Sequence, residues 1–109
     1  MGQYHKVYNI DKKQFIHPHK IGHGLKLLEQ VGFDKSASSA LFLLLANSNG
    51  RGGGDASHHP LIGAWAGDRI VVQGDYARVT DPGYIADVDE FEDISDNVGD
   101  MLGMVFYEY

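Results

Sequence analysis

The segment Gly50-Arg-Gly-Gly-Gly-Asp places the charged side chain of Arg51 among four glycines. Consecutive backbone N–H groups without surrounding side chains can form an anion-binding nest, to which the Arg51 guanidinium adds charged donors. The segment follows a predicted helix instead of preceding one, so it is neither a P-loop nor a dinucleotide-binding fingerprint. Two interpretations stay open: a mobile connector, or a loop that binds phosphate through Arg51, Gly52, Gly53 and Gly54.

Three histidines lie close together in His17-Pro-His-Lys-Ile-Gly-His, and His58 and His59 follow later. Imidazole is a ligand for zinc, copper and nickel. His17 and His19, however, are spaced i, i+2 around a proline, unlike the i, i+4 pairs of helical zinc sites, so we expect no metal. The simplest interpretation is histidines at the surface. The functional one is contact with a phosphate through His17, His19 and Lys20.

The single tryptophan lies between two glycines in Gly63-Ala-Trp-Ala-Gly-Asp-Arg. If the glycines expose the Trp65 indole, its face can stack on a nucleobase, while Arg69 pairs with a phosphate or with Asp68. If they do not, Trp65 is a core residue. Tyr4 and Tyr8, which share one face of a predicted strand, have the same two interpretations.

The sequence lacks the common patterns of covalent catalysis. It contains no cysteine, which excludes disulfides and thiolate chemistry, and no Gly-x-Ser-x-Gly elbow. The eight carboxylates between Asp81 and Asp100 do not form a calcium loop, because Phe91 occupies the third ligand position. We therefore expect a binding protein without a cofactor more than an enzyme.

The charge is unevenly divided along the chain. The net charge of −6 disfavours general binding of nucleic acid. Residues 1–50 carry six lysines and three acids, a balance of +3, whereas residues 51–109 carry three arginines and twelve acids, a balance of −9. An anionic ligand would prefer the first half or its border at Arg51. The acidic half is either a solvated face or a surface that blocks another protein.

The predicted elements describe one α+β domain over residues 1–109. We expect an antiparallel sheet, made of an N-terminal hairpin and central strands, packed against two or three helices. Alternation predicts strands over 3–9, 14–17, 61–66, 69–73 and 76–79, with a loop over 17–24. Apolar spacing predicts helices over 25–31, 36–47 and 95–104, of which 36–47 is apolar on nearly all sides and is expected to face both a sheet and a second subunit.

No targeting or membrane segment is evident in the sequence. The longest apolar run covers residues 40–46, far short of the roughly 18–20 residues that a membrane span needs. The chain does not open on a basic region followed by an apolar one, so we expect no signal peptide and a cytoplasmic location.

Three motifs together resemble a family of small phage and bacterial proteins whose function is not established. They are the Gly2-Gln-Tyr start, the central Asn47-Ser-Asn-Gly-Arg-Gly-Gly-Gly-Asp loop and Trp65-Ala-Gly-Asp-Arg, and the likeness covers residues 2–75. The resemblance implies a phage context, with the host cytoplasm as the location. Small phage accessory proteins often counter host defences by blocking a protein or by sequestering a nucleotide signal.

These observations together predict a non-enzymatic, homo-oligomeric protein that binds a small anionic ligand. The ligand class is a nucleotide or another phosphate-bearing signal, which a counter-defence sponge would sequester. The expected binding residues are Arg51, Gly52, Gly53, Gly54, Trp65, Arg69, His17, His19 and Lys20. One alternative is a protein-blocking inhibitor that uses Glu90, Glu92 and Asp93 of the acidic half, and a second is a small nucleotide hydrolase or lyase.

Overall fold

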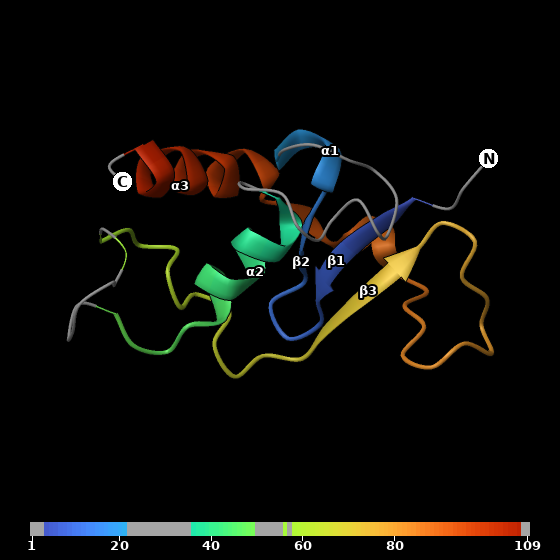
Figure 1. Ribbon diagram of the computed structural model, residues 1–109. Helices are drawn as coiled ribbons and strands as arrows, with labels where there is room; N and C mark the ends of the chain where they lie inside the picture. Colours follow the sequence, from blue (N-terminus) through green and yellow to red (C-terminus); the bar gives the residue numbers. More distant parts are fainter. Residues whose placement is uncertain (1–3, 22–35, 50–55, 57, 108–109) are drawn as a thin grey trace.

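The chain folds into an α+β structure with a four-stranded sheet and three helices, seen in a computed structural model that describes residues 4–21, 36–49, 56 and 58–107 (Figure 1). The strand order is β3-β1-β2-β4. The strands are β1 (His5–Asn9), β2 (Gln14–Ile16), β3 (Ile70–Gly74) and β4 (Glu92–Asp93). The helices are α1 (Pro18–Ile21), α2 (Ala37–Leu45) and α3 (Ser95–Tyr107), with a short 3₁₀ helix at Val88–Glu90.

The sheet is largely, but not wholly, antiparallel. β1 pairs with β2 and with β3 in antiparallel register, so that Val7 lies between Ile16 and Val72. β4 runs parallel to β2, with Gln14 opposite Glu92. The prediction of an α+β fold with an antiparallel sheet is confirmed for β1, β2 and β3. The parallel strand β4 is added at the other edge because the long 75–91 segment crosses the sheet before β4 begins.

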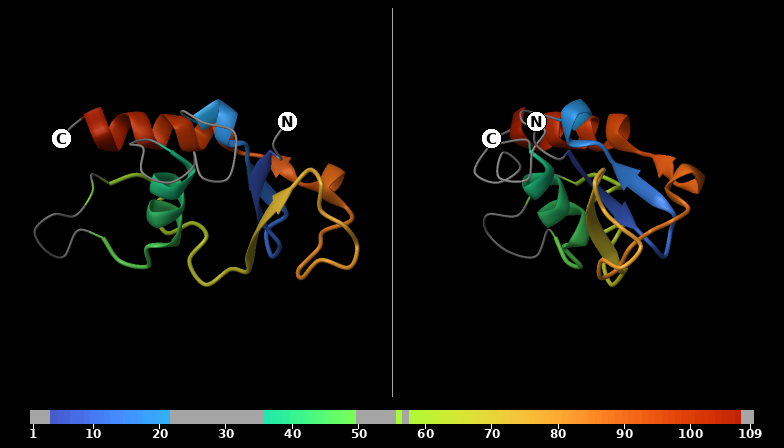
Figure 2. Two further views of the ribbon diagram at one scale, coloured as in Figure 1. Left: turned by 45° about the vertical axis from the view of Figure 1, so that its right-hand side comes forward. Right: turned by 90° about the vertical axis from the view of Figure 1, so that its right-hand side faces the viewer.

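The two faces of the sheet are covered by different parts of the chain (Figure 2). Val7 and Ile16 belong to the main core, together with buried residues of α2 and α3 such as Leu44 and Met101. Tyr8 and its neighbours face the opposite side, where they form a second cluster with Ile85 and Phe91 of the 75–91 segment. The alternation along β1 therefore divides the apolar side chains between two layers.

The segment 61–66, predicted as a strand, is a series of tight turns that closes the end of α2. The backbone N–H groups of Gly63 and Trp65 donate to the carbonyls of Leu43 and Leu44, each at 2.9 Å. The last carbonyls of a helix lack donors within the helix, so these two bonds satisfy them. Gly63 is suited to this contact because its φ is +82° and a Cβ there would lie 2.7 Å from the Ala46 oxygen.

Trp65 is fully buried, which corrects its prediction as a stacking platform for a ligand. Its ring belongs to the main core, and its Nε1–H donates to Oε1 of Gln14 on β2 at 2.9 Å. The glycines on either side of Trp65 do not expose the indole. They permit tight turns, and these turns direct the ring into the main core.

Other boundaries follow or depart from the predicted ones. The hairpin of β1 and β2 and the strand β3 are confirmed, as are the helices α2 and α3, the second of which extends to Tyr107. The predicted loop over 17–24 contains the short helix α1, and residues 76–79 form no strand. The helix predicted over 25–31 lies outside the described residues.

Ion pairs connect the basic first half of the chain with the acidic second half. The pairs are Lys12–Asp68, Lys13–Asp87 at 3.4 Å, Lys13–Glu90 at 4.0 Å, Lys20–Asp93 at 2.7 Å and Arg69–Asp11 at 2.8 Å. Each of them joins a residue before position 50 to one after it. Such exposed pairs contribute about 0–1 kcal/mol each, so their effect lies more in neutralising charge than in stability.

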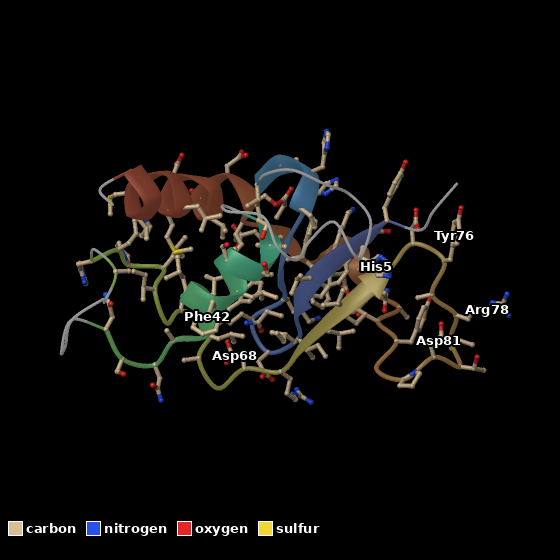
Figure 3. All side chains as sticks on the ribbon, in the orientation of Figure 1. His5, Phe42, Asp68, Tyr76, Arg78 and Asp81 are labelled. Atoms are coloured by element: carbon tan, nitrogen blue, oxygen red, sulfur yellow. The ribbon has the colours of Figure 1, made fainter. Side chains whose placement is uncertain are left out.

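Trp65→Ala should lower the free energy of unfolding by about 3–5 kcal/mol, because it removes a large buried ring and leaves a cavity. Phe42→Ala is the matched control, since the Phe42 ring projects from α2 and is 83% exposed (Figure 3). We expect it to cost less than about 0.5 kcal/mol. Urea denaturation followed by circular dichroism measures both. Equal losses in the two variants would contradict the placement of Trp65 in the core.

Candidate functional site

A cavity of about 450 Å³ lies between the second face of the sheet and the 75–88 segment. Its lining includes three tyrosines, Tyr4, Tyr8 and Tyr84, together with Lys6 and His17, and we call it the tyrosine cavity. Sites for small molecules typically measure about 300–1,000 Å³ and combine apolar or aromatic walls with a few polar groups. The size and lining of this cavity agree with that description.

The pleat of β1 places the side chains at the base of the cavity. Lys6 and Tyr8 share one face of the strand, and Tyr4 continues that face just before it. The Tyr8 ring packs edge-on against Phe91 and tilted against Phe15, with centroids 5.5 Å apart in both cases. Burial, and then the Asp89 carboxylate, raise the pKa of Tyr8, so its phenol remains a neutral hydroxyl at physiological pH.

The opposite wall of the cavity is attached to β3 through one side chain. The Gln73 amide accepts from the Ile85 N–H at 2.7 Å and donates to the Ile85 carbonyl at 3.1 Å. A turn at 81–83 brings the chain back toward the sheet, where Gly83, with φ of +72°, lies close to Val71. These contacts hold Tyr84 beside the sheet and keep the cavity open between them.

Lys6 is the cation of the cavity. Its ammonium lies 5.4 Å from the centre of the Phe15 ring, and it makes no ion pair with any described residue. The other lysines of the described chain, Lys12, Lys13 and Lys20, are each paired with a carboxylate. Among the described lysines, Lys6 is therefore the one that an anion could bind without displacing a carboxylate.

His17 directly follows β2 and lines the cavity together with Lys6. Its backbone N–H donates to Oγ of Ser95 at 2.7 Å, and its buried Nδ1 has no hydrogen-bond partner within the described chain. Burial, then the Lys6 charge, lower the pKa of His17 below its usual 6.5. The imidazole is consequently neutral near pH 7, and an anion in the cavity would favour its protonated form.

The other predicted binding residues that the structure describes do not line the tyrosine cavity. His19 lies on α1 with its ring 6.0 Å from that of His17, and Lys20 is bound to Asp93. Arg69 immediately precedes β3 and does not line the cavity, and its guanidinium donates to Asp11 instead of to the predicted Asp68. Of the predicted residues that the structure describes, His17 alone lines the tyrosine cavity.

Arg51 and Gly52–Gly54 lie outside the described residues, but the chain on both sides of them is described. The Asn49 amide donates to the Ala56 carbonyl at 3.0 Å and accepts from the Ala56 N–H at 2.9 Å, which closes the base of this loop. A smaller cavity of about 320 Å³ lies next to that pair, with His58 and His59 in its wall. The prediction that the loop binds phosphate remains a prediction.

Sequence reasoning identified part of the cavity and missed the rest. It placed Tyr4 and Tyr8 on one strand face as candidate stacking residues, and it named His17. It passed over Lys6, although Lys6 lies between those tyrosines in the same alternating pattern. Nothing in the sequence indicated Tyr84, because a residue after a turn reaches the site only through the fold of the 75–88 segment.

No three His, Asp or Glu side chains among the described residues are placed to hold a metal ion. No helix in the described chain is long and apolar enough to cross a membrane. Comparison with protein-family models, with curated proteins and with solved structures found no match to this chain.

His17 should titrate below its usual pKa of 6.5 in the folded protein. Because its pKa is lowered in the folded state, His17 binds fewer protons there than in the unfolded state just below pH 6.5. Protonation of His17 therefore lowers the free energy of unfolding as the pH falls. The stability difference between the wild type and His17→Gln should therefore change between about pH 7 and pH 5, in the direction that favours the variant at low pH. NMR titration of the imidazole measures the pKa directly, and a value at or above 6.5 would contradict the burial argument.

Proposed function

We propose that this protein binds a small anionic ligand without transforming it, and that the ligand is a nucleotide or another phosphate-bearing molecule with an aromatic group. The tyrosine cavity is the proposed site. One observation carries the proposal: Lys6, whose ammonium is free of carboxylates within the described chain, lies in a cavity walled by three tyrosines. Phenol rings suit the face of a base, and an ammonium suits a phosphate.

The remaining polar groups of the cavity suit a ligand that carries hydroxyl or amino groups as well as a phosphate. His17 adds a second group that can carry positive charge near Lys6. Asp75 also lines the cavity, and its Oδ1 accepts the Tyr4 N–H at 3.1 Å. A carboxylate there repels a phosphate but accepts hydrogen bonds from hydroxyl or amino groups. A nucleotide placed with its phosphate toward Lys6 and its sugar or base toward Asp75 satisfies both ends.

Binding without chemistry is favoured by the composition of the cavity wall. The described lining residues include no serine, threonine or cysteine that His17 could activate as a nucleophile. In the phage context that the resemblance implies, tight binding alone lowers the free concentration of a nucleotide signal. The protein would then act as a sponge for that signal.

The protein-blocking alternative receives less support from the acidic half. Asp93 is bound to Lys20, and Lys13 contacts both Asp87 and Glu90. These carboxylates are partly neutralised within the chain. A cationic partner protein would have to compete with its lysines.

Lys6→Met should weaken binding of the ligand by about 10- to 150-fold, the equivalent of about 1.5–3 kcal/mol for a hydrogen bond to a charged group. Native mass spectrometry of the protein with a mixture of linear and cyclic nucleotides selects the ligand, and calorimetry then gives its affinity. Lys13→Met is the matched control, because it removes the same charge at an exposed turn outside the cavity.

The two variants distinguish a site from general charge attraction. Equal weakening by Lys6→Met and Lys13→Met would mean that the nucleotide responds only to net charge. A nucleotide that is bound and then recovered as a different mass would support the hydrolase or lyase alternative instead. No adduct with any nucleotide would overturn the proposal.

A further inference from the structure

The outer edge of β3 is a strand edge without a partner in the described chain. β3 ends the sheet and pairs only with β1. The Ile10 N–H donates to the Arg69 carbonyl and the Asp75 N–H donates to the Tyr4 carbonyl, both at 2.9 Å. Since alternate residues of an antiparallel strand bond to the same side, Val71 and Gln73 face β1. Ile70, Val72 and Gly74 therefore direct their N–H and C=O groups outward, although the Gly74 carbonyl already accepts from the Ala77 N–H at 3.1 Å.

The strand itself lacks the sequence features that usually protect a sheet edge. Proteins commonly prevent edge pairing with charged side chains, prolines or bulges. The five residues of β3, Ile-Val-Val-Gln-Gly, contain no charge and no proline, and their register with β1 is uninterrupted. The Val72 side chain is 46% exposed. A hollow of about 170 Å³, lined in part by Val72, Gly74 and Tyr84, follows the same edge.

We propose that a second copy of this chain pairs with this edge, with the two β3 strands antiparallel about a two-fold axis at Val72. The axis places Val72 opposite the partner's Val72, and these two residues exchange both of their outward hydrogen bonds. It places Ile70 opposite the partner's Gly74, whose N–H donates to the Ile70 carbonyl and continues the ladder. The two sheets then form one continuous sheet of eight strands.

Charge complementarity selects this register. Arg69 and Asp75 each lie three residues from Val72, on opposite sides of it. A two-fold axis at Val72 therefore places Arg69 of each chain opposite the partner's Asp75. Arg69 already donates to Asp11, but its side chain is 74% exposed and can reach a second carboxylate. A two-fold axis at Ile70 or Gly74 loses both Arg–Asp pairs and shortens the ladder.

The inference is independent of the proposed ligand, although the two surfaces meet. Asp75 also lines the tyrosine cavity, so pairing brings the partner's Arg69 to its rim. Figure 3 shows Tyr76, Arg78 and Asp81 projecting from the chain beyond the end of β3. These side chains belong to the segment that follows the strand, and Asp81 also lines the hollow beside Val72 and Gly74.

Val72→Lys should convert a dimer into a monomer, because it places two ammonium groups opposite each other at the axis. Val79→Lys is the matched control: Val79 is also an exposed valine, at 78%, but it lies beyond the strand. Sedimentation velocity should give twice the 12.0 kDa chain mass for the wild type and Val79→Lys, and the single-chain mass for Val72→Lys. Circular dichroism confirms that each variant is folded.

A single introduced cysteine tests the contact without disturbing the charge, because the natural chain has none. Hydrogen-bonded antiparallel neighbours lie with their Cα atoms about 5.5 Å apart, within disulfide reach. Mild oxidation should crosslink Val72→Cys into covalent dimers and leave Val79→Cys largely monomeric. A wild type that stays monomeric at about 100 µM would overturn the proposal, since mass action favours association there. So would a dimer that Val72→Lys leaves intact.

Discussion

The alternation of side chains along β1 governs most of this structure. β1 is flanked by β2 and β3, so each of its residues faces either the main core or the tyrosine cavity. The register that buries Val7 against α2 and α3 also holds Lys6 and Tyr8 on the other face. A strand cannot move one side chain across its plane without moving all of them. The position of a lysine inside the cavity is thus tied to the packing of the core.

The divided charge of the chain has a structural role as well as a functional one. By composition the basic first half is the part that would attract an anion. In the folded chain Lys12, Lys13 and Lys20 are bound to carboxylates of the acidic second half. These pairs tie together segments far apart in the sequence and neutralise most of the lysines of the described chain. Lys6 is left in a partly enclosed site, where low polarity strengthens its interaction with an anion.

The sequence predicted elements whose periodicity is long and regular, and it missed contacts that only the fold creates. Alternation in β1 and the apolar spacing of α3 were sufficient to predict both elements. Residues 61–66 have the apolar composition of a strand, but the unsatisfied carbonyls at the end of α2 bind their N–H groups and impose turns. The same turns bury Trp65, which glycines on both sides had suggested was accessible. In the candidate site, His17 was predicted from its type, whereas Tyr84 depends on the path of the 75–88 segment.

The most direct test of the central claim is a two-dimensional ¹H–¹⁵N NMR titration with the nucleotide selected by mass spectrometry. If the ligand binds in the tyrosine cavity, the largest shifts occur at the β1 amides of Lys6 and Tyr8, at His17 and in the 75–88 segment. The amides of Asn49, Ala56 and His58, at the base of the glycine-rich loop, should shift little. Large shifts confined to that loop base, with β1 unchanged, would contradict the assignment of the ligand to the tyrosine cavity.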